Sequence, residues 1–299
     1  MLEPSLRFGL GCTILRYVAY PVLLAAAVAT IAITIRTEAS VALVSLCFVP
    51  CAIAYLAVLE QIIPYDRAWL PAAWEWRRDG LYYLLTMVSG GLARAAVVSV
   101  GSIVAPLRPS LPLWAEIPLA VLVLSLFSFG FHRLSHHHGW LWKLHGVHHA
   151  TDKVNVANNS VNQFLDVALH GFAAQLPLFL LGLSQPAVFA AGVFKAAQGY
   201  GVHANIDVRL GGLGYVLAIP EQHRLHHSVN PRESGHYGAD LPLWDFVFGS
   251  FTWRPHRAPA RVGLQDPDSF PSTRSILSNQ MHAFRRSGRH RHPDGDIRD

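Results

Sequence analysis

Five long apolar segments dominate the first two thirds of the chain. The fifth is interrupted by Pro177 and Pro186, which break or kink a helix. The other four each approach the roughly 20 apolar residues that a membrane-spanning helix needs. We therefore expect an all-α integral membrane protein with about four to six hydrophobic segments, the last one a kinked or re-entrant hairpin. The five segments are residues 17–35, 40–59, 81–105, 111–131 and 172–200.

The first apolar segment invites a second interpretation, as the core of a cleaved signal peptide. Signal cores usually run for about 7–15 apolar residues. Residues 17–35 exceed that length. We therefore expect a helix that is retained in the membrane.

Basic residues flank the apolar segments unequally, and this asymmetry predicts an orientation. Cytoplasmic loops of membrane proteins carry the excess of Lys and Arg. With the N-terminus inside, four crossings return the chain to the cytoplasm at His132. We expect a multi-pass protein of the bacterial inner membrane, with its histidine clusters in a helical, histidine-rich metal-binding cap on the cytoplasmic side. One side carries Arg7, Arg16, Arg67, Arg77, Arg78, Arg133 and Lys143, and the other carries Arg36 and Arg108.

Composition supports the membrane assignment and divides the chain. Hydrophobic residues make up 52% and charged residues 14% of the 299 residues, against about a quarter charged in soluble domains. The excess of Lys and Arg in the cytoplasmic loops and the tail accounts for the net charge of +5. We therefore expect no nucleic-acid partner. We expect a transmembrane region over residues 1–110, a catalytic domain over 111–253, and a polar, basic, partly disordered tail over 254–299. The tail concentrates Arg285, Arg286, Arg289 and Arg291.

Histidine is unusually frequent, and its spacing is regular. The chain holds 17 histidines against 19 Asp plus Glu. His132 and His136 are four residues apart, which places both rings on one face of a helix. We predict a built metal site, with His137 and His138 outside the pattern, either exposed or in a supporting role. Two later triplets repeat His-x-x-His-His, at His145, His148 and His149 and at His223, His226 and His227.

The number of patterned histidines indicates the kind of metal centre. Eight ligands exceed the four of a tetrahedral zinc site, so we expect two metals. Imidazole suits zinc, iron, copper and nickel, so the donor type leaves the metal open. No carboxylate recurs at ligand spacing, which argues against the Glu-x-x-His di-iron bundle. No His-Glu-x-x-His occurs either, which disfavours a zinc protease.

Three segments carry a resemblance to a known family. They are residues 132–136 (HRLSH), 142–149 (WKLHGVHH) and 220–228 (PEQHRLHHS). In order and spacing they resemble the three histidine boxes of the fatty acid hydroxylase/sterol desaturase superfamily. The resemblance covers roughly residues 120–252 and continues through residues 203–205, 237–238, 243–245 and 248–249.

The resemblance implies an integral membrane enzyme in which a non-haem di-iron centre uses O2 to hydroxylate or desaturate a lipid. Two iron ions are the implied cofactors, and zinc is a substitute expected in purified material. Asp245 and Asn205 are our candidates for accepting hydrogen bonds from the outer ring nitrogens of the ligands. The implied ligands, carried over by position, are His132, His136, His145, His148, His149, His223, His226 and His227, with His203 as a further recurrent family histidine.

The chain departs from the family pattern at three places. Ser125 stands where members often carry an acidic residue, seven positions before the first box histidine. Residues 161–163 read Val-Asn-Gln where many carry Arg-x-His. His236 replaces the usual Asn before Tyr-Gly and is a candidate compensating ligand. His170, by contrast, is expected to be a polar cap on the apolar hairpin.

The function that we predict is O2-dependent hydroxylation of a fatty acid, sterol or related lipid. Lipid desaturation and ether-lipid monooxygenation are alternatives within the superfamily, and a non-catalytic member is a third. A membrane metal transporter or sensor is the alternative from another class. It should place ionisable groups at mid-membrane, where our reading finds only Arg94.

Electrons for such a reaction must come from outside the chain. Cys12, Cys47 and Cys51 are too few for a cluster with four thiolate ligands, and no cytochrome haem motif occurs. The expected partner is a ferredoxin or small cytochrome with its reductase.

Overall fold

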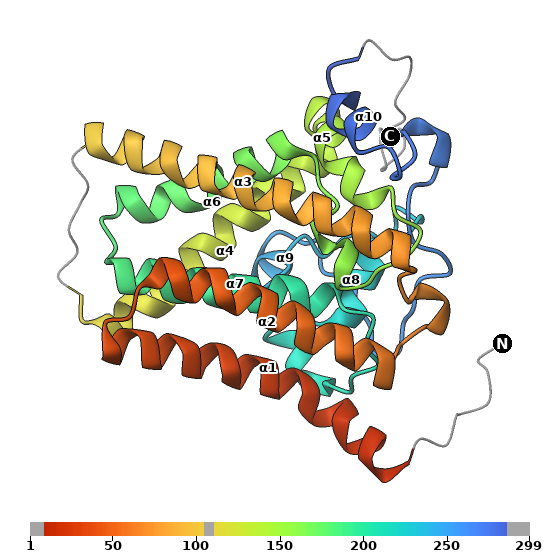
Figure 1. Ribbon diagram of the computed structural model, residues 1–299, viewed down its shortest axis with the longest axis horizontal. Coiled ribbons are helices and arrows are strands. Elements are labelled where there is room, and N and C mark those ends of the chain that lie inside the picture. Colours follow the sequence, from red (N-terminus) through yellow and green to blue (C-terminus); the bar gives the residue numbers. More distant parts are fainter. Residues whose placement is uncertain (1–8, 105–110, 286–299) are drawn as a thin grey trace.

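The structure is a computed structural model, and it describes residues 9–104 and 111–285. These residues form helices and turns, with isolated β-bridges in place of strands, which confirms the all-α prediction. The long helices run side by side, and α5, α8 and α10 gather at one end (Figure 1). The elements are α1 (Leu10–Thr37), α2 (Val41–Ile62), α3 (Ala73–Ile103), α4 (Leu113–His137), α5 (Gly139–His149), α6 (Phe164–Leu180), α7 (Gln185–His203), α8 (Pro220–His226), α9 (Leu243–Val247) and α10 (Ile276–His282), with 3-10 turns at Arg67–Trp69, Ala157–Ser160, Gly211–Tyr215 and Pro267–Ser269.

Helices α1 to α4 are each long and apolar enough to cross a membrane. Their outward faces carry large apolar side chains such as Leu46, Val88 and Leu92, all more than half exposed. Side chains of this kind face lipid at little cost but would be unfavourable over so wide a surface in water. The four-span prediction is therefore confirmed.

The helices extend beyond the apolar segments at the histidine end. Helix α3 begins at Ala73, eight residues before the predicted segment, and α4 continues six residues past 131 to His137. The helical hydrogen bonds persist there because the first turns of α3 bury polar groups in ion pairs, such as Glu75 with Lys153. The last turns of α4 bury His132 and His136.

The fifth apolar segment forms a helical hairpin of α6 and α7. Pro186 lies in the first turn of α7, where its missing N–H costs nothing. The turn at residues 181–184 is tied to the start of α4, because Glu116 accepts hydrogen bonds from both the amide and the hydroxyl of Ser184, each at 2.6 Å. The chain therefore turns back here, as the hairpin interpretation predicts.

Helix α1 is part of the bundle core. Its Tyr20 is fully buried and donates a hydrogen bond to Gln198 Oε1 on α7 at 2.7 Å. Gly201 makes room for this contact, since a β-carbon there would lie 3.0 Å from the Tyr20 ring. Helix α1 and helix α7 consequently approach closely beside the histidine end.

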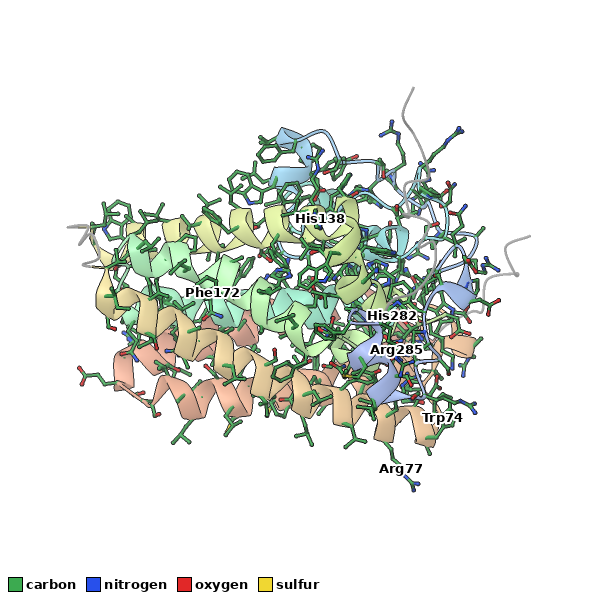
Figure 2. The ribbon with its side chains drawn as sticks, turned by 90° about the horizontal axis from the view of Figure 1, so that it is seen from above. Trp74, Arg77, His138, Phe172, His282 and Arg285 are labelled. Atoms are coloured by element: carbon green, nitrogen blue, oxygen red, sulfur yellow. The ribbon has the colours of Figure 1, made fainter. Side chains whose placement is uncertain are left out.

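The basic and polar residues gather at the histidine end of the bundle. Trp74, Arg77, His282 and Arg285 lie at that end, whereas Phe172 lies nearer the middle (Figure 2). The part of the predicted tail that the structure describes, residues 254–285, packs on α5 through α10. Phe270 contacts Gly146 so closely that a β-carbon there would lie 2.3 Å from its ring. Arg286, Arg289 and Arg291 lie outside the described residues.

Candidate metal centre

All nine histidines singled out in the sequence come together in two groups. Within each group, one ring nitrogen from every member lies within 4.8 Å of the others. Every member is buried. Group one comprises His132, His136, His145, His149 and His226, and group two comprises His148, His203, His223 and His227.

Helical spacing assigns neighbouring histidines to different groups. On α5, His145 and His149 are four residues apart and share a face, so both join group one, while His148 points to group two. The second triplet, on and just after α8, divides in the same way. His223 and His227, four residues apart, join group two, and His226 joins group one. The two groups adjoin, because the rings of His149 and His227 stack with centroids 4.4 Å apart. Helices α5 and α8 thus supply both groups and hold them together.

Burial gives these imidazoles the protonation state that metal binding requires. Among the described residues, every member except His223 has a buried ring nitrogen with no hydrogen-bond partner. Desolvation lowers the pKa of His226 to about 3, and that of His148 well below its usual range. Neutral rings with inward-facing lone pairs are the form that binds a cation. The residues therefore fit a bound metal in each group.

The outer ring nitrogens are held by hydrogen bonds that orient the rings. His145 Nδ1 is 3.0 Å from Asp166 Oδ2. His132 Nδ1 is 2.6 Å from the Tyr237 carbonyl oxygen, and His203 Nδ1 is 2.8 Å from the Asn155 carbonyl oxygen. Such partners select the ring tautomer and increase ligand basicity.

Asp166 and Lys195 are two polar residues that the sequence reasoning missed. Asp166 is 21 residues from the histidine it supports, so no local spacing marks it. Its only sequence signal is an acidic residue near the start of an apolar segment. Lys195 lies inside the fifth apolar segment, and an isolated charge within apolar sequence is a usable signal. Arg94 is therefore not the only ionisable residue deep in the bundle.

The two residues predicted to support the ligands contact backbone instead. Asp245 accepts hydrogen bonds from the amides of Tyr237 and Gly238, at 2.9 and 3.0 Å, and burial raises the pKa of its carboxyl. Asp245 thus holds the loop whose Tyr237 carbonyl meets His132. Asn205 hydrogen-bonds the backbone of Asp66. Among the described hydrogen bonds, neither side chain accepts one from a ligand ring.

The departures from the family pattern have local explanations. Ser125 is fully buried and donates to Asp240 Oδ1 at 2.7 Å, so a carboxylate still lies beside this turn of α4. Gln163 caps α6 by accepting from the amides of Leu165 and Asp166. Capping places the first turn of α6, and with it the carboxylate that supports His145.

His236 and the remaining histidines lie outside both groups. His236 has a left-handed backbone, with φ at 62°, a conformation that Asn tolerates better than most residues. Its Nε2 accepts from the Thr252 amide at 3.1 Å, and neither of the two histidine groups includes it. His137 and His138 are exposed, as predicted. His170, expected to be a polar cap, contacts Ser128 inside the bundle at 2.8 Å.

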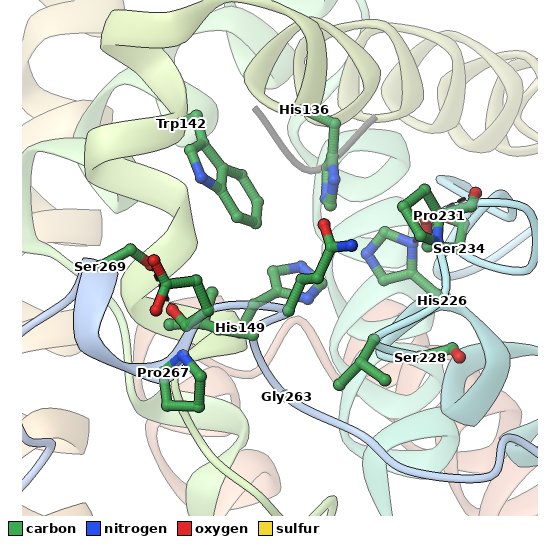
Figure 3. A pocket seen from close by; sticks show the side chains of 14 residues that line it. His136, Trp142, His149, His226, Ser228, Pro231, Ser234, Gly263, Pro267 and Ser269 are labelled. Atoms are coloured by element: carbon green, nitrogen blue, oxygen red, sulfur yellow. Dashed lines mark hydrogen bonds between the residues drawn. The ribbon is translucent and has the colours of Figure 1, made fainter. Parts of the chain in front are cut away.

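A polar pocket of about 320 Å³ reaches group one from the side of the cap and tail. His136, His149 and His226 converge on it, with Trp142 on one wall (Figure 3). Its other lining residues come mainly from segments 228–234 and 263–269. We name this space the cap pocket.

A larger space of about 730 Å³ reaches both groups from within the bundle. His132 and His145 of group one line it, as do His148 and His223 of group two. The rest of its lining is largely apolar and comes mainly from α4, α6 and α7, with Arg94 of α3 and Gln175 of α6 among the polar members. We name this space the bundle cavity, and several residues of segment 172–200 form part of its wall.

Comparison with known proteins finds relatives that are named lipid hydroxylases or monooxygenases. The ornithine lipid hydroxylase OlsE of Rhizobium tropici is 28% identical over 252 residues, covering 79% of this chain and 74% of that protein. An alkylglycerol monooxygenase of Danio rerio is 31% identical over 151 residues, covering 50% of this chain and 33% of that protein. The Homo sapiens alkylglycerol monooxygenase is 29% identical over 126 residues, covering 41% of this chain and 27% of that protein.

The chain therefore spans only about a third of each of these two monooxygenases. No solved structure matches it significantly. The fatty acid hydroxylase family profile matches residues 117–250, which include every member of both histidine groups. Residues 117–250 therefore match the fatty acid hydroxylase family, in agreement with the resemblance of the histidine boxes.

Proposed function

We propose that this protein is an O2-dependent lipid hydroxylase of the membrane, with one non-haem iron in each histidine group. One observation carries the proposal. Two buried histidine groups lie side by side at the end of an apolar cavity of about 730 Å³ inside a membrane-spanning bundle. Such an arrangement suits an enzyme that takes its substrate from the bilayer.

The metal assignment rests on the donors and on the chemistry required. Imidazoles are the only side chains in the two groups, and imidazole suits iron as well as zinc and copper. Bound iron would supply the redox chemistry that attack on an unactivated C–H bond needs and that no side chain provides. Zinc in purified material would be a substitute.

The chain's own residues would orient the ligands and separate the reactants. Asp166 and the Tyr237 carbonyl fix two rings of group one. The apolar wall of the bundle cavity would bind the lipid and exclude water, while the cap pocket would admit O2 and protons. Two separate routes therefore meet at group one.

The overall reaction would convert a lipid C–H bond into C–OH. One oxygen atom of O2 enters the lipid and the other leaves as water, which consumes two electrons and two protons. The electrons would come from an external ferredoxin or small cytochrome with its reductase.

The names of the relatives favour hydroxylation or ether-lipid monooxygenation over desaturation. The residue distribution supports a location in the bacterial inner membrane with the histidines on the cytoplasmic side.

The test is untargeted lipid analysis of cells with and without the gene. We expect one lipid class to gain a single oxygen atom only when the intact gene is present. Loss of two hydrogens instead would indicate desaturation. Metal uptake by reconstituted vesicles, with no change in any lipid, would overturn the proposal in favour of a transporter.

A further inference from the structure

Lys195 is an ionisable residue inside the apolar helix pair. It lies on α7, ten residues after Gln185 and eight before His203, and it lines the bundle cavity. Charged side chains at membrane depth are costly, and those that occur usually face the protein interior and mark binding sites. A lysine at this place therefore requires a functional explanation.

Two further polar side chains meet Lys195 at the cavity wall. Its ammonium donates a hydrogen bond to Ser128 Oγ on α4. The same Ser128 Oγ lies 2.8 Å from His170 Nε2 on α6. All three residues line the cavity, so three helices present polar groups to one point. We name these residues the polar cluster.

The positive charge of Lys195 has no ion-pair partner in the part of the chain that the structure describes. The carboxylate of Asp240, whose neighbour Ala239 lines the same cavity, already accepts from Ser125 Oγ at 2.7 Å and from the Leu241 amide. A lysine ammonium has three donors, so the cluster retains hydrogen-bonding capacity toward the cavity.

The polar cluster divides the cavity into two parts. Toward the hairpin turn, the wall is mainly apolar and includes Leu178, Val188 and Phe189. Gln185 lies in this part, and Gln175 and Arg94 also line the cavity. Toward the other end lie the histidine groups, and His132 follows Ser128 by one turn of α4. A group bound at the cluster would therefore lie between an apolar tail and the metal centre.

We propose that Lys195, Ser128 and His170 bind an anionic group of the lipid substrate, a carboxylate or a phosphate. Its hydrocarbon tail then occupies the apolar part of the cavity. The atoms beside the anionic group lie against the histidines, so the oxidised carbon is close to the polar end of the lipid. This inference rests on the proposed function, because it names the substrate class of the same site.

The test measures binding without turnover, on the full-length zinc-loaded protein in detergent. Two matched pairs of lipids serve as probes: an N-acylornithine lipid with its carboxyl methyl ester, and phosphatidic acid with diacylglycerol. Native mass spectrometry gives the ratio of dissociation constants within each pair. We expect a preference of at least about 10-fold for one anionic member, the scale of one hydrogen bond to a charged group.

Three variants locate that preference. Lys195→Met should reduce the ratio to about 1, because it removes the charge but keeps the length of the side chain. Lys195→Arg should retain most of it. Lys143→Met is the matched control, since Lys143 lies outside both the cap pocket and the bundle cavity, and it should change nothing. The two probe pairs also test the wild-type protein alone, independently of how each variant folds.

The possible outcomes separate this inference from the proposed function. A wild-type protein with no preference in either pair overturns the inference, as does a preference that survives Lys195→Met. An equal loss of preference in Lys143→Met overturns it too, because the loss would then not depend on the position of the lysine. Loss of preference only in Lys195→Met supports the anionic subsite even if no lipid is oxidised in cells, a result that would overturn only the proposed function.

Discussion

The two histidine groups have the same kind of donor but different surroundings. Group one has five members, and one of them is supported by a carboxylate, Asp166. It borders both the cap pocket and the bundle cavity. Group two has four members, and the Nδ1 of His203 meets a backbone carbonyl. Two of its members, His148 and His223, line the bundle cavity, and none of the four lines the cap pocket. The two metals that we propose would therefore differ in affinity and in access.

Removing one ligand from each group is the strongest way to test this comparison. His226→Ala in group one and His148→Ala in group two should each abolish lipid oxidation. Metal analysis should show about one metal lost per chain in each variant, from about two by the ligand count. Membrane insertion should persist, as measured by fractionation. Full activity in either variant would contradict the assignment of that group.

Acidification should destabilise the metal-free protein. Burial lowers the pKa of His226 to about 3, whereas an unfolded chain has a histidine pKa of about 6.5. As the pH falls, the unfolded state therefore binds protons first. The free energy of unfolding is highest above about pH 6.5 and decreases toward pH 3, by about 1.4 kcal/mol per pH unit for such a histidine.

Thermal unfolding of chelator-treated protein in detergent, at a series of pH values, measures this effect. A melting temperature that rises as the pH is lowered from 6.5 to 4 would show that these rings are not buried and neutral. His223 and His227 of group two, whose pKa values are also lowered by burial, should contribute in the same direction.

Asp166→Asn should weaken group one selectively. The variant keeps the shape of the side chain but removes the charge that supports His145, and loss of such a partner typically costs about 10- to 100-fold in metal affinity or activity. Metal titration should show one weakened and one unchanged site per chain. Equal weakening of both sites would mean that the groups do not bind independently.

Glu60→Ala is the corresponding change for group two. Glu60 Oε1 accepts from the amides of Val156 and Asn205, at 2.6 and 2.8 Å, and these residues flank the two segments that position His203. Leaving two buried amides unpaired should cost about 1–3 kcal/mol each in stability. We expect a lower melting temperature and weaker binding of one metal, while Glu60→Gln, which keeps an acceptor, should have a smaller effect.

His236→Asn should have the smallest effect. Asn tolerates the left-handed backbone at this position, and it loses the contact of the imidazole with the Thr252 amide. These opposing changes should leave stability within about 0.5 kcal/mol of the original. Metal content should not change, and loss of one metal would show that His236 is a ligand after all.

The sequence by itself determined the helices and the identity of the clustered histidines. Apolar runs of about 20 residues specify spanning helices because the bilayer requires backbone hydrogen bonds to be made within the segment. Spacings of three and four residues put His145, His148 and His149 on neighbouring faces of one helix. Both signals are local, so a single sequence is enough to find them.

The tertiary structure decided how those histidines divide into two groups, and what surrounds them. His203 joins group two because α7 packs beside α8, and its ring centroid lies 5.0 Å from that of His148 on α5. Asp166 meets His145, and Lys195 meets Ser128, across helix pairs whose relative rotation no local pattern encodes. The contacts that Asp245 and Asn205 make with backbone groups depend on the same packing. A side chain's partner across a helix interface depends on the packing of whole helices, and sequence spacing reports only on neighbours within one helix.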